Sequence, residues 1–176
     1  MDIDTLTFER LDQSQTIDTF DCGNEDLNDF LISDAARYQD SLLAVTYLVK
    51  RDDEVVGYFS LLNDKLSLVE SNKRVWRKIK RVFHHSMHRC DYPAVKVGRI
   101  AVGVNYQGFD IGTKIMDYVK YSFINKNRTG CAFVTVDSLR KALPFYMKNN
   151  FKIVDDSQLS SDDKTIQMYY DLTQLI

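Results

Sequence analysis

The residues best suited to chemistry in this chain lie between Arg99 and Gly112. The apolar run IAV follows Arg99, and the sequence GVNYQGFDIG comes next. These letters predict a strand, a glycine-bearing loop and the start of a helix. Such a turn presents free backbone N–H groups and the positive end of a helix dipole, which together bind anions. On these residues alone, an anion site and an ordinary strand–helix turn are both open.

A second candidate for chemistry is Tyr146, in the sequence ALPFYMKNNF. A phenol can hydrogen-bond or protonate a departing thiolate, and a thiol with a pKa near ~8.5 then leaves more easily. The residue types alone favour a plainer interpretation, a half-buried aromatic on an amphipathic helix. The choice depends on what accompanies Tyr146 in the chain.

The two segments together resemble the GNAT superfamily of acetyltransferases. The family's pyrophosphate-binding loop follows the pattern Gln/Arg-x-x-Gly-x-Gly/Ala, and Gln107 and Gly112 match its ends. Asp110 replaces the central glycine, so a carboxylate stands where it could face the phosphates of CoA. The segment VTVDS followed by ALPFYMKNNF resembles the next block of the family, which places Tyr146 at the position of the general acid.

This resemblance implies one N-acetyltransferase domain over residues 1–176, of the α+β (α/β-like) class, with a mixed, twisted central sheet flanked by helices. It implies acetyl-CoA as co-substrate and no metal, and it allows a homodimer. The residues that it assigns to binding acetyl-CoA are Ile100, Ala101, Val102, Gln107, Gly108, Phe109, Asp110, Ile111 and Gly112.

Hydrophobic periodicity and turn residues predict the elements around these segments. Asn24 or Asp26 caps the first helix, and Pro93 closes the region of the second. Val75, Ile79, Val82, Phe83 and Met87 share the apolar face of that second helix. The expected strands are 3–10, 44–50, 55–62, 95–102, 131–137, 151–154 and 165–171; the expected helices are 24–40, 72–89, 110–126 and 138–149.

The N-terminal half extends the resemblance to about residues 8–172. The sequences FDCG at 20–23 and GYFSL at 57–61 occur in the family's order. They resemble the branch that contains toxin-type acetyltransferases, which acetylate the amino group of aminoacyl-tRNA, together with standalone enzymes. The resemblance therefore leaves the acceptor open between a primary amine in general and aminoacyl-tRNA.

The acceptor nitrogen must be neutral to attack a thioester. Strand 95–102 contains no Asp or Glu that could remove its proton, and Asp137 is either a base or a helix cap. An α-amine is about 10% neutral at pH 7 and a lysine-like amine only about 0.04%, which favours an α-amino acceptor. A backbone N–H near Ile100 or Val102 is expected to hold the oxyanion.

Positive charge is concentrated between Ser71 and Cys90. Seven of the 23 Lys and Arg residues lie in this stretch, together with all three His and no Asp or Glu. The rest of the chain has 16 Lys and Arg and all 25 Asp and Glu residues. This basic helix 71–89 could neutralise tRNA phosphates, form an ordinary solvated face, or receive the acidic loop 155–163. Trp76 is expected to be partly buried, and the surrounding bases argue against a metal at the histidines.

Three widely spaced cysteines, an acidic N-terminus and the lack of any apolar run near ~20 residues predict a cytoplasmic protein without a membrane anchor. Asp110 and the lack of an evident base keep a third class open, a non-catalytic CoA-binding module.

Overall fold

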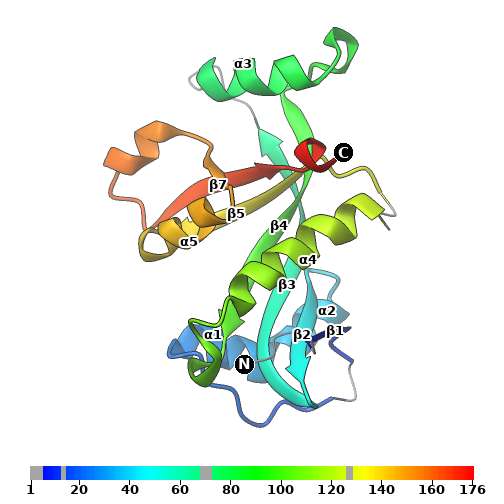
Figure 1. The fold of residues 1–176 in the computed structure, drawn as a ribbon, viewed down its shortest axis with the longest axis vertical. Helices are drawn as coiled ribbons and strands as arrows, with labels where there is room; N and C mark the ends of the chain where they lie inside the picture. The colour runs from blue at the N-terminus through cyan, green and yellow to red at the C-terminus, as the bar shows by residue number, and fades with distance from the viewer. Residues whose placement is uncertain (1–5, 13–14, 68–72, 126–128) are drawn as a thin grey trace. The chain divides into compact units, whose positions relative to one another are not determined.

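The computed structural model describes residues 6–12, 15–67, 73–125 and 129–176. Its strands form one seven-stranded sheet in the order β1-β2-β3-β4-β5-β7-β6, drawn in Figure 1. The β4–β5 pair is parallel and the β1–β2, β2–β3, β5–β7 and β6–β7 pairs are antiparallel, so the predicted mixed sheet with flanking helices is confirmed. The chain divides into two compact units, Met1–Leu62 with Val97–Val119 and Asn63–Lys96 with Lys120–Ile176.

The first unit begins with an antiparallel meander of β1 (Thr7–Arg10), β2 (Val45–Arg51) and the first part of β3 (Glu54–Ser67). Asp52 and Asp53 connect β2 to β3 with φ angles of 48° and 68°. Two left-handed residues suit a tight hairpin, because they match the twist of the strands that they join. The predicted hairpin is confirmed, and β3 continues five residues beyond its predicted end at residue 62.

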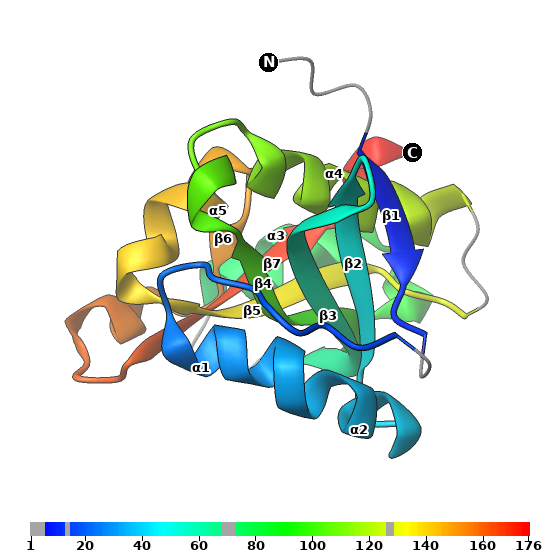
Figure 2. The same cartoon turned by 90° about the horizontal axis from the view of Figure 1, so that it is seen from below.

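Helices α1 (Glu25–Asp29) and α2 (Ala35–Asp40) are joined by a π-helical turn over Phe30–Asp34. The Asn24 side chain accepts a hydrogen bond from the Leu27 N–H, which confirms the predicted N-cap. Both helices lie along one face of β2 and β3, as Figure 2 shows. Their apolar residues pack with the strands around buried Phe30, Leu48 and Tyr58.

The first unit also holds the end of β4 (Asp91–Val102) and the start of α4 (Ile111–Asn125). A 3-10 turn over Val104–Tyr106 lies between them. Tyr118 of α4 stacks on Phe8 and meets the ring of Phe59 of β3 edge-on, which packs α4 against the strands. The predicted strand–loop–helix arrangement is therefore present.

The second unit is built on β5 (Phe133–Leu139), β6 (Lys152–Ile153) and β7 (Thr165–Asp171). Helices α3 (Lys73–Val82) and α5 (Leu143–Lys148) belong to it as well. Its core surrounds the fully buried Leu66, Ile79 and Phe133, with Val75, Trp76 and Phe83 of the α3 segment packed against them. Short 3-10 turns cover His85–Met87, Arg140–Ala142, Asp156–Ser160 and Leu172–Leu175.

The predicted helix 72–89 is too long, since α3 ends at Val82 and its predicted first residue lies outside the described residues. The Nε2–H of His88 points at the carbonyl oxygens of Lys80 and Phe83, at 3.0 and 3.1 Å, so this side chain caps the end of α3. Val82 and Met87 are consequently exposed rather than inward-facing. The prediction that Pro93 closes this region is also wrong, because Pro93 lies inside β4.

The predicted helix 138–149 is replaced by the Arg140–Ala142 turn followed by the short α5. The Arg140 side chain organises the predicted acidic surface loop 155–163. The Arg140 guanidinium donates hydrogen bonds to the carbonyls of Gln158, Leu159, Ser161 and Asp163.

Within the described residues, no helix is long and apolar enough to span a membrane.

Candidate functional site

The loop between β4 and α4 ends in two residues with left-handed backbone. Gly108 has a φ of 83° and Asp110 a φ of 57°, and α4 begins at the next residue, Ile111. Nothing lies within 4 Å of a Cβ built on Gly108, so open space borders the loop there. The first N–H groups of a helix have no partner within the helix, so this turn offers donors to an anion.

The Gln107 side chain fixes the entry to this loop. Its amide nitrogen donates hydrogen bonds to the backbone carbonyls of Val102 and Cys22, both at 2.9 Å. The glutamine is therefore engaged with the protein through its amide group. A role for Gln107 in holding an anion would run through its backbone and through the loop conformation that its side chain stabilises.

The left-handed φ of Asp110 gives a physical reason for the glycine that the GNAT pattern has at this position. Glycine adopts φ near 57° without strain, and among other residues Asp and Asn do so most readily. Asp110 is thus compatible with the backbone of the loop. Its carboxylate is on an exposed residue beside the first turn of α4.

The other predicted cofactor residues differ in which of their atoms are accessible. The side chains of Ala101 and Ile111 are buried in the core, so only their backbone could reach a ligand. Gly108, Phe109 and Asp110 are exposed. The remaining predicted residues, Ile100, Val102 and Gly112, are half-buried.

Strand β3 holds the end of β4 in place through a close approach at Gly57. A Cβ built on Gly57 would lie 2.8 Å from the carbonyl oxygen of Ala101, which is too close for any side chain. The Gly103 N–H donates to the carbonyl of Val56 at 2.9 Å, one residue earlier on β3. These contacts position the backbone of Ile100–Val102.

A cavity of about 630 Å³ lies on the N-terminal side of the same loop. Its lining includes Asp18, Asp21, Glu54 and the 3-10 turn of residues 104–106. Hydrogen bonds from the Gly23 N–H and the Asn28 side chain lower the pKa of the Asp21 carboxyl. The acidic lining does not suit phosphate groups, and none of the predicted residues 107–112 lines this cavity.

Tyr146 belongs to the second unit and is the one buried side chain of α5. Its ring contacts Phe145 and Phe151 edge-on, at centroid distances of 5.0 and 5.5 Å. Burial raises the pKa of the Tyr146 hydroxyl well above its usual range. The phenol is therefore protonated at neutral pH, as a proton donor must be.

The buried Lys120 stabilises the C-terminal end of α5, the helix that carries Tyr146. Lys120 of α4 donates to the carbonyl of Asn149, the C-cap of α5, at 3.1 Å. Its ammonium lies 4.6 Å from the centre of the Tyr170 ring. The Asn149 side chain in turn donates to the carbonyl of Phe145, which holds the last turn of α5 closed.

One comparison with known protein families identifies the domain that contains these two segments. A family model described as an acetyltransferase (GNAT) domain matches residues 21–172. The chain belongs to this acetyltransferase family. The match contains both the β4–α4 loop and Tyr146.

Several solved structures share the fold. One is AtaT in complex with acetyl-methionyl-tRNAfMet, 22% identical, with a TM-score of 0.71 over 97% of this chain and 96% of that one. A tyrosine-to-phenylalanine mutant of KacT is 24% identical, with a TM-score of 0.70 over 98% and 99%. AtaTR bound with acetyl-CoA is 22% identical, with a TM-score of 0.67 over 98% and 97%.

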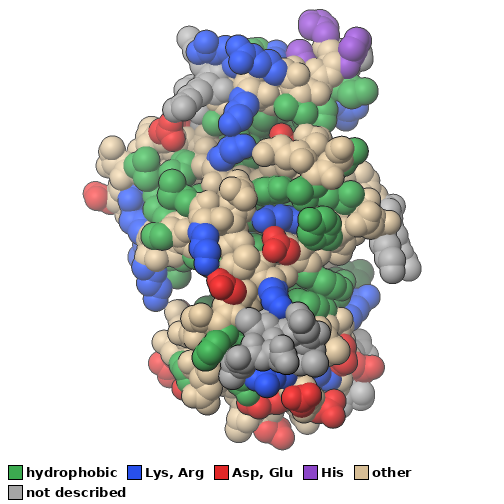
Figure 3. Space-filling view, in the orientation of Figure 1, with side chains coloured by type: hydrophobic (Ala, Val, Ile, Leu, Met, Phe, Trp, Pro, Cys, Tyr) green, Lys and Arg blue, Asp and Glu red, His purple; other side chains and the backbone are tan. Residues whose placement is uncertain are grey.

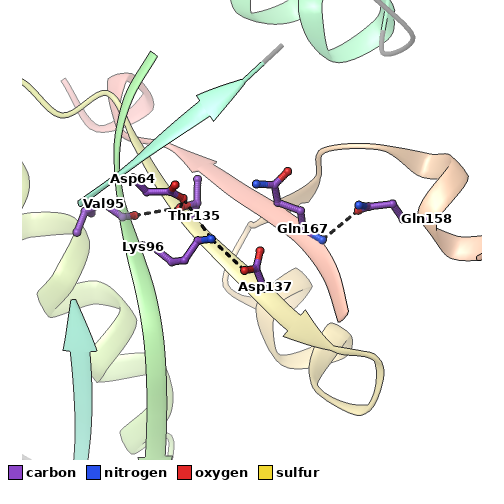
Figure 4. A network of polar contacts seen from close by, with 7 residues as sticks. All are labelled: Asp64, Val95, Lys96, Thr135, Asp137, Gln158 and Gln167. Carbon is purple, nitrogen blue, oxygen red and sulfur yellow. Dashed lines mark hydrogen bonds and ion pairs between the residues drawn. The ribbon is translucent and has the colours of Figure 1, made fainter. Parts of the chain in front are cut away.

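Asp137 of the GNAT chain forms an ion pair instead of the predicted helix cap. Its carboxylate accepts a hydrogen bond from the Lys96 ammonium at 2.9 Å, as Figure 4 shows. Asp64 lies 3.6 Å from the same ammonium and accepts a 2.5 Å hydrogen bond from the Thr135 hydroxyl. Burial alone would lower the pKa of Lys96, but the two carboxylates outweigh burial and raise it. In the sequence, only Lys96, a single lysine within an apolar strand, indicated this network.

Three of the described cationic side chains of α3 are exposed to solvent. Figure 3 shows Lys and Arg gathered over this helix, with the histidines beside them. Arg77, Lys78 and Arg81 are exposed, and Arg89 lies in the segment that follows. Lys80 instead lies over the half-buried Trp76 ring, 3.2 Å from its centre, which confirms the predicted partial burial of Trp76. The side chains of Lys73 and Arg74 lie outside the described set.

Proposed function

We propose that this GNAT protein is a cytoplasmic enzyme that transfers the acetyl group of acetyl-CoA directly to the α-amino group of an aminoacyl-tRNA. The observation that carries acetyl transfer is the family match over residues 21–172, which contains the left-handed turn before α4 and the buried Tyr146. The tRNA acceptor is supported by the exposed cations of α3 and by the likeness to a fold solved with an acetylated tRNA.

The turn at the start of α4 is assigned to the pyrophosphate of acetyl-CoA. Backbone N–H groups at the start of α4 would donate to its oxygens, since the first N–H groups of a helix have no partner within the helix. The backbone of Ile100 or Val102 would hold the oxygen of the thioester while negative charge develops on it. Gly57 and Gln107 keep this backbone in position.

Tyr146 is assigned to the leaving group. The neutral amine attacks the carbonyl carbon of the acetyl thioester, a new C–N bond forms and the C–S bond breaks. The electron pair of that bond leaves on sulfur as a thiolate, which takes the phenolic proton. The amide nitrogen gives its extra proton to water, which then returns a proton to the tyrosine. Burial raises the pKa of this hydroxyl, so the phenol stays protonated at neutral pH but is a weaker acid than a free tyrosine.

An α-amine is the acceptor that fits a site without a dedicated base. Asp137, the candidate base, forms an ion pair with the Lys96 ammonium, which also pairs with Asp64. Its carboxylate is therefore already engaged. A substrate that is already about 10% neutral at pH 7 needs little help with deprotonation. Water suffices as the proton acceptor for such an amine.

Replacement of Tyr146 by phenylalanine tests this mechanism. With a Tyr146→Phe variant we expect kcat for aminoacyl-tRNA to fall about 100-fold or more, while the Kd for acetyl-CoA stays the same. Tyr92→Phe is the matched control, because Tyr92 is equally buried in the same unit and its hydroxyl accepts one hydrogen bond, from the Arg89 N–H. An unchanged kcat in Tyr146→Phe would exclude the tyrosine as the proton donor.

One observation favours a second function, a non-catalytic CoA-binding module. Asp137, the candidate base, is paired with Lys96 and so is not placed to take a proton from an amine. A non-catalytic module would bind acetyl-CoA and acetylate no amine in a broad panel. Robust turnover with any amine would exclude it.

A further inference from the structure

A second cavity, of about 250 Å³, lies in the second unit among α3, α5 and β6. Apolar side chains form most of its wall: Val75, Met147, Phe151, Ile153 and Tyr169. The charged residues that line it are Lys78, Lys152 and Asp156. Its size is below that of sites for drug-sized ligands and suits a small group such as a phosphate with part of a sugar.

The side chains of Lys78 and Lys152 both line this cavity, although they belong to separate elements. Lys78 extends from the exposed side of α3, and Lys152 is half-buried on β6. Within the described part of the chain, neither ammonium forms an ion pair. Burial lowers the pKa of Lys152, and the nearby Lys78 lowers it further, while the charge of Asp171 acts in the opposite direction.

Two like charges that lie close together in a partly apolar setting repel one another, and this arrangement is costly unless an anion joins them. We propose that Lys78 and Lys152 form a binding site for a phosphate group at this cavity. The source of the phosphate is the backbone of the RNA that carries the acceptor amine, and this assignment of the source rests on the proposed function.

The surroundings of the cavity favour an RNA phosphate over a free one. The exposed Arg77 and Arg81 continue the positive surface from Lys78 along α3. A row of cations that begins at a pocket matches a chain of phosphates, whereas a single small anion needs only the two lysines. The exposed Met147 in the wall of the cavity can pack against a sugar beside the phosphate.

The carboxylate of Asp156 would repel an anion in the cavity, so its removal tests the proposed site independently of the two lysines. Its carboxylate lines the same space as the two lysines. Removal of that negative charge by Asp156→Asn should strengthen phosphate binding, whereas loss of either lysine should weaken it. A merely structural role for the three residues would not produce opposite signs.

The test measures binding of deacylated tRNA by fluorescence anisotropy across a salt series, for the full-length chain and its variants. Each of Lys78→Met and Lys152→Met should reduce the slope of log K against log salt by about 0.9, and thus reduce affinity about 10-fold at 0.1 M salt. Lys164→Met is the matched control, since Lys164 is an exposed lysine elsewhere in the same unit. Lys152→Arg should retain affinity, which separates lost charge from a damaged fold.

A second measurement identifies the source of the phosphate. The 13Cε resonance of Lys152 is followed against pH with and without inorganic pyrophosphate, and with a short RNA. Binding in the cavity should raise the pKa of Lys152. Wild-type affinity and salt slope in both lysine variants, with no shift of this resonance by RNA or pyrophosphate, would overturn the site.

Acetylation of aminoacyl-tRNA, measured on the same preparations, separates failure of this site from failure of the proposed function. If the wild type acetylates aminoacyl-tRNA and the lysine variants bind tRNA normally, the phosphate site is wrong and the function stands. If the wild type leaves aminoacyl-tRNA unmodified while pyrophosphate shifts the Lys152 resonance, the anion site stands with a free phosphate as its ligand.

Discussion

Substitution of Asp110 by asparagine tests whether the β4–α4 loop binds the pyrophosphate of acetyl-CoA. Asparagine tolerates the left-handed φ of 57° as well as aspartate does, and it caps a helix equally well, so the change removes little except the charge. Because Asp110 is exposed, its repulsion of a phosphate is that of charges in water. At a separation of ~6 Å this repulsion is about 0.7 kcal/mol per phosphate charge.

Two phosphate charges give about 1.4 kcal/mol, or a factor of about 10 in affinity at low salt. At 0.15 M ionic strength, screening over ~8 Å roughly halves the repulsion, which leaves a factor of about three. Calorimetric titration with acetyl-CoA at low and at physiological salt should therefore show tighter binding by Asp110→Asn, with a gain that shrinks as salt is added.

Asp53→Asn is the matched control, since Asp53 is also an exposed aspartate with a left-handed φ, of 68°, but lies in the β2–β3 turn. This control should bind acetyl-CoA as the wild type does. An unchanged Kd for Asp110→Asn at low salt would refute the assignment of the pyrophosphate to this loop. If both variants bind acetyl-CoA more tightly by the same factor, the effect comes from the net charge of the protein and not from the position of Asp110.

Three further predictions concern the elements around the site. Gly57→Ala should destabilise the protein by about 2 kcal/mol in urea unfolding and weaken acetyl-CoA binding, because its Cβ would press on the Ala101 carbonyl. The raised pKa of Lys96 means that its ion pairs contribute stability below pH ~10.5 and lose it as pH rises through the folded-state pKa, so Lys96→Met should make the alkaline fall in melting temperature smaller. Arg140→Ala should make residues 155–163 more sensitive to limited proteolysis, because four backbone carbonyls lose their donor, while the melting temperature falls only slightly.

The sequence predicted those parts of the fold that depend on neighbouring residues. Asn24 begins a helix as expected, and the β2–β3 hairpin joins the two predicted segments of β-branched and aromatic residues. The strand–loop–helix segment around Asp110 was also predicted, because its glycines and its apolar periods are local signals. In each case the information lies within a few residues.

Features that depend on distant or unusual partners were missed. The end of α3 at Val82 follows from the side chain of His88, which the periodicity of the helix does not contain. Asp137 was predicted as a cap because its partner Lys96 is distant in sequence. Lys78 and Lys152 are farther apart still, and no motif connects them, so their shared cavity is visible only in three dimensions.

The central claim is that acetyl-CoA donates its acetyl group to the α-amine of an aminoacyl-tRNA with Tyr146 as proton donor. The most direct measurement incubates the purified protein with radiolabelled acetyl-CoA and equal amounts of aminoacyl-tRNA, the free amino acids and a lysine peptide. The account predicts label on the amino acid of the aminoacyl-tRNA, released with it by mild alkali, and about 100-fold less label with Tyr146→Phe. Label on the lysine peptide or free amino acids alone, or equal labelling by Tyr146→Phe, would contradict it.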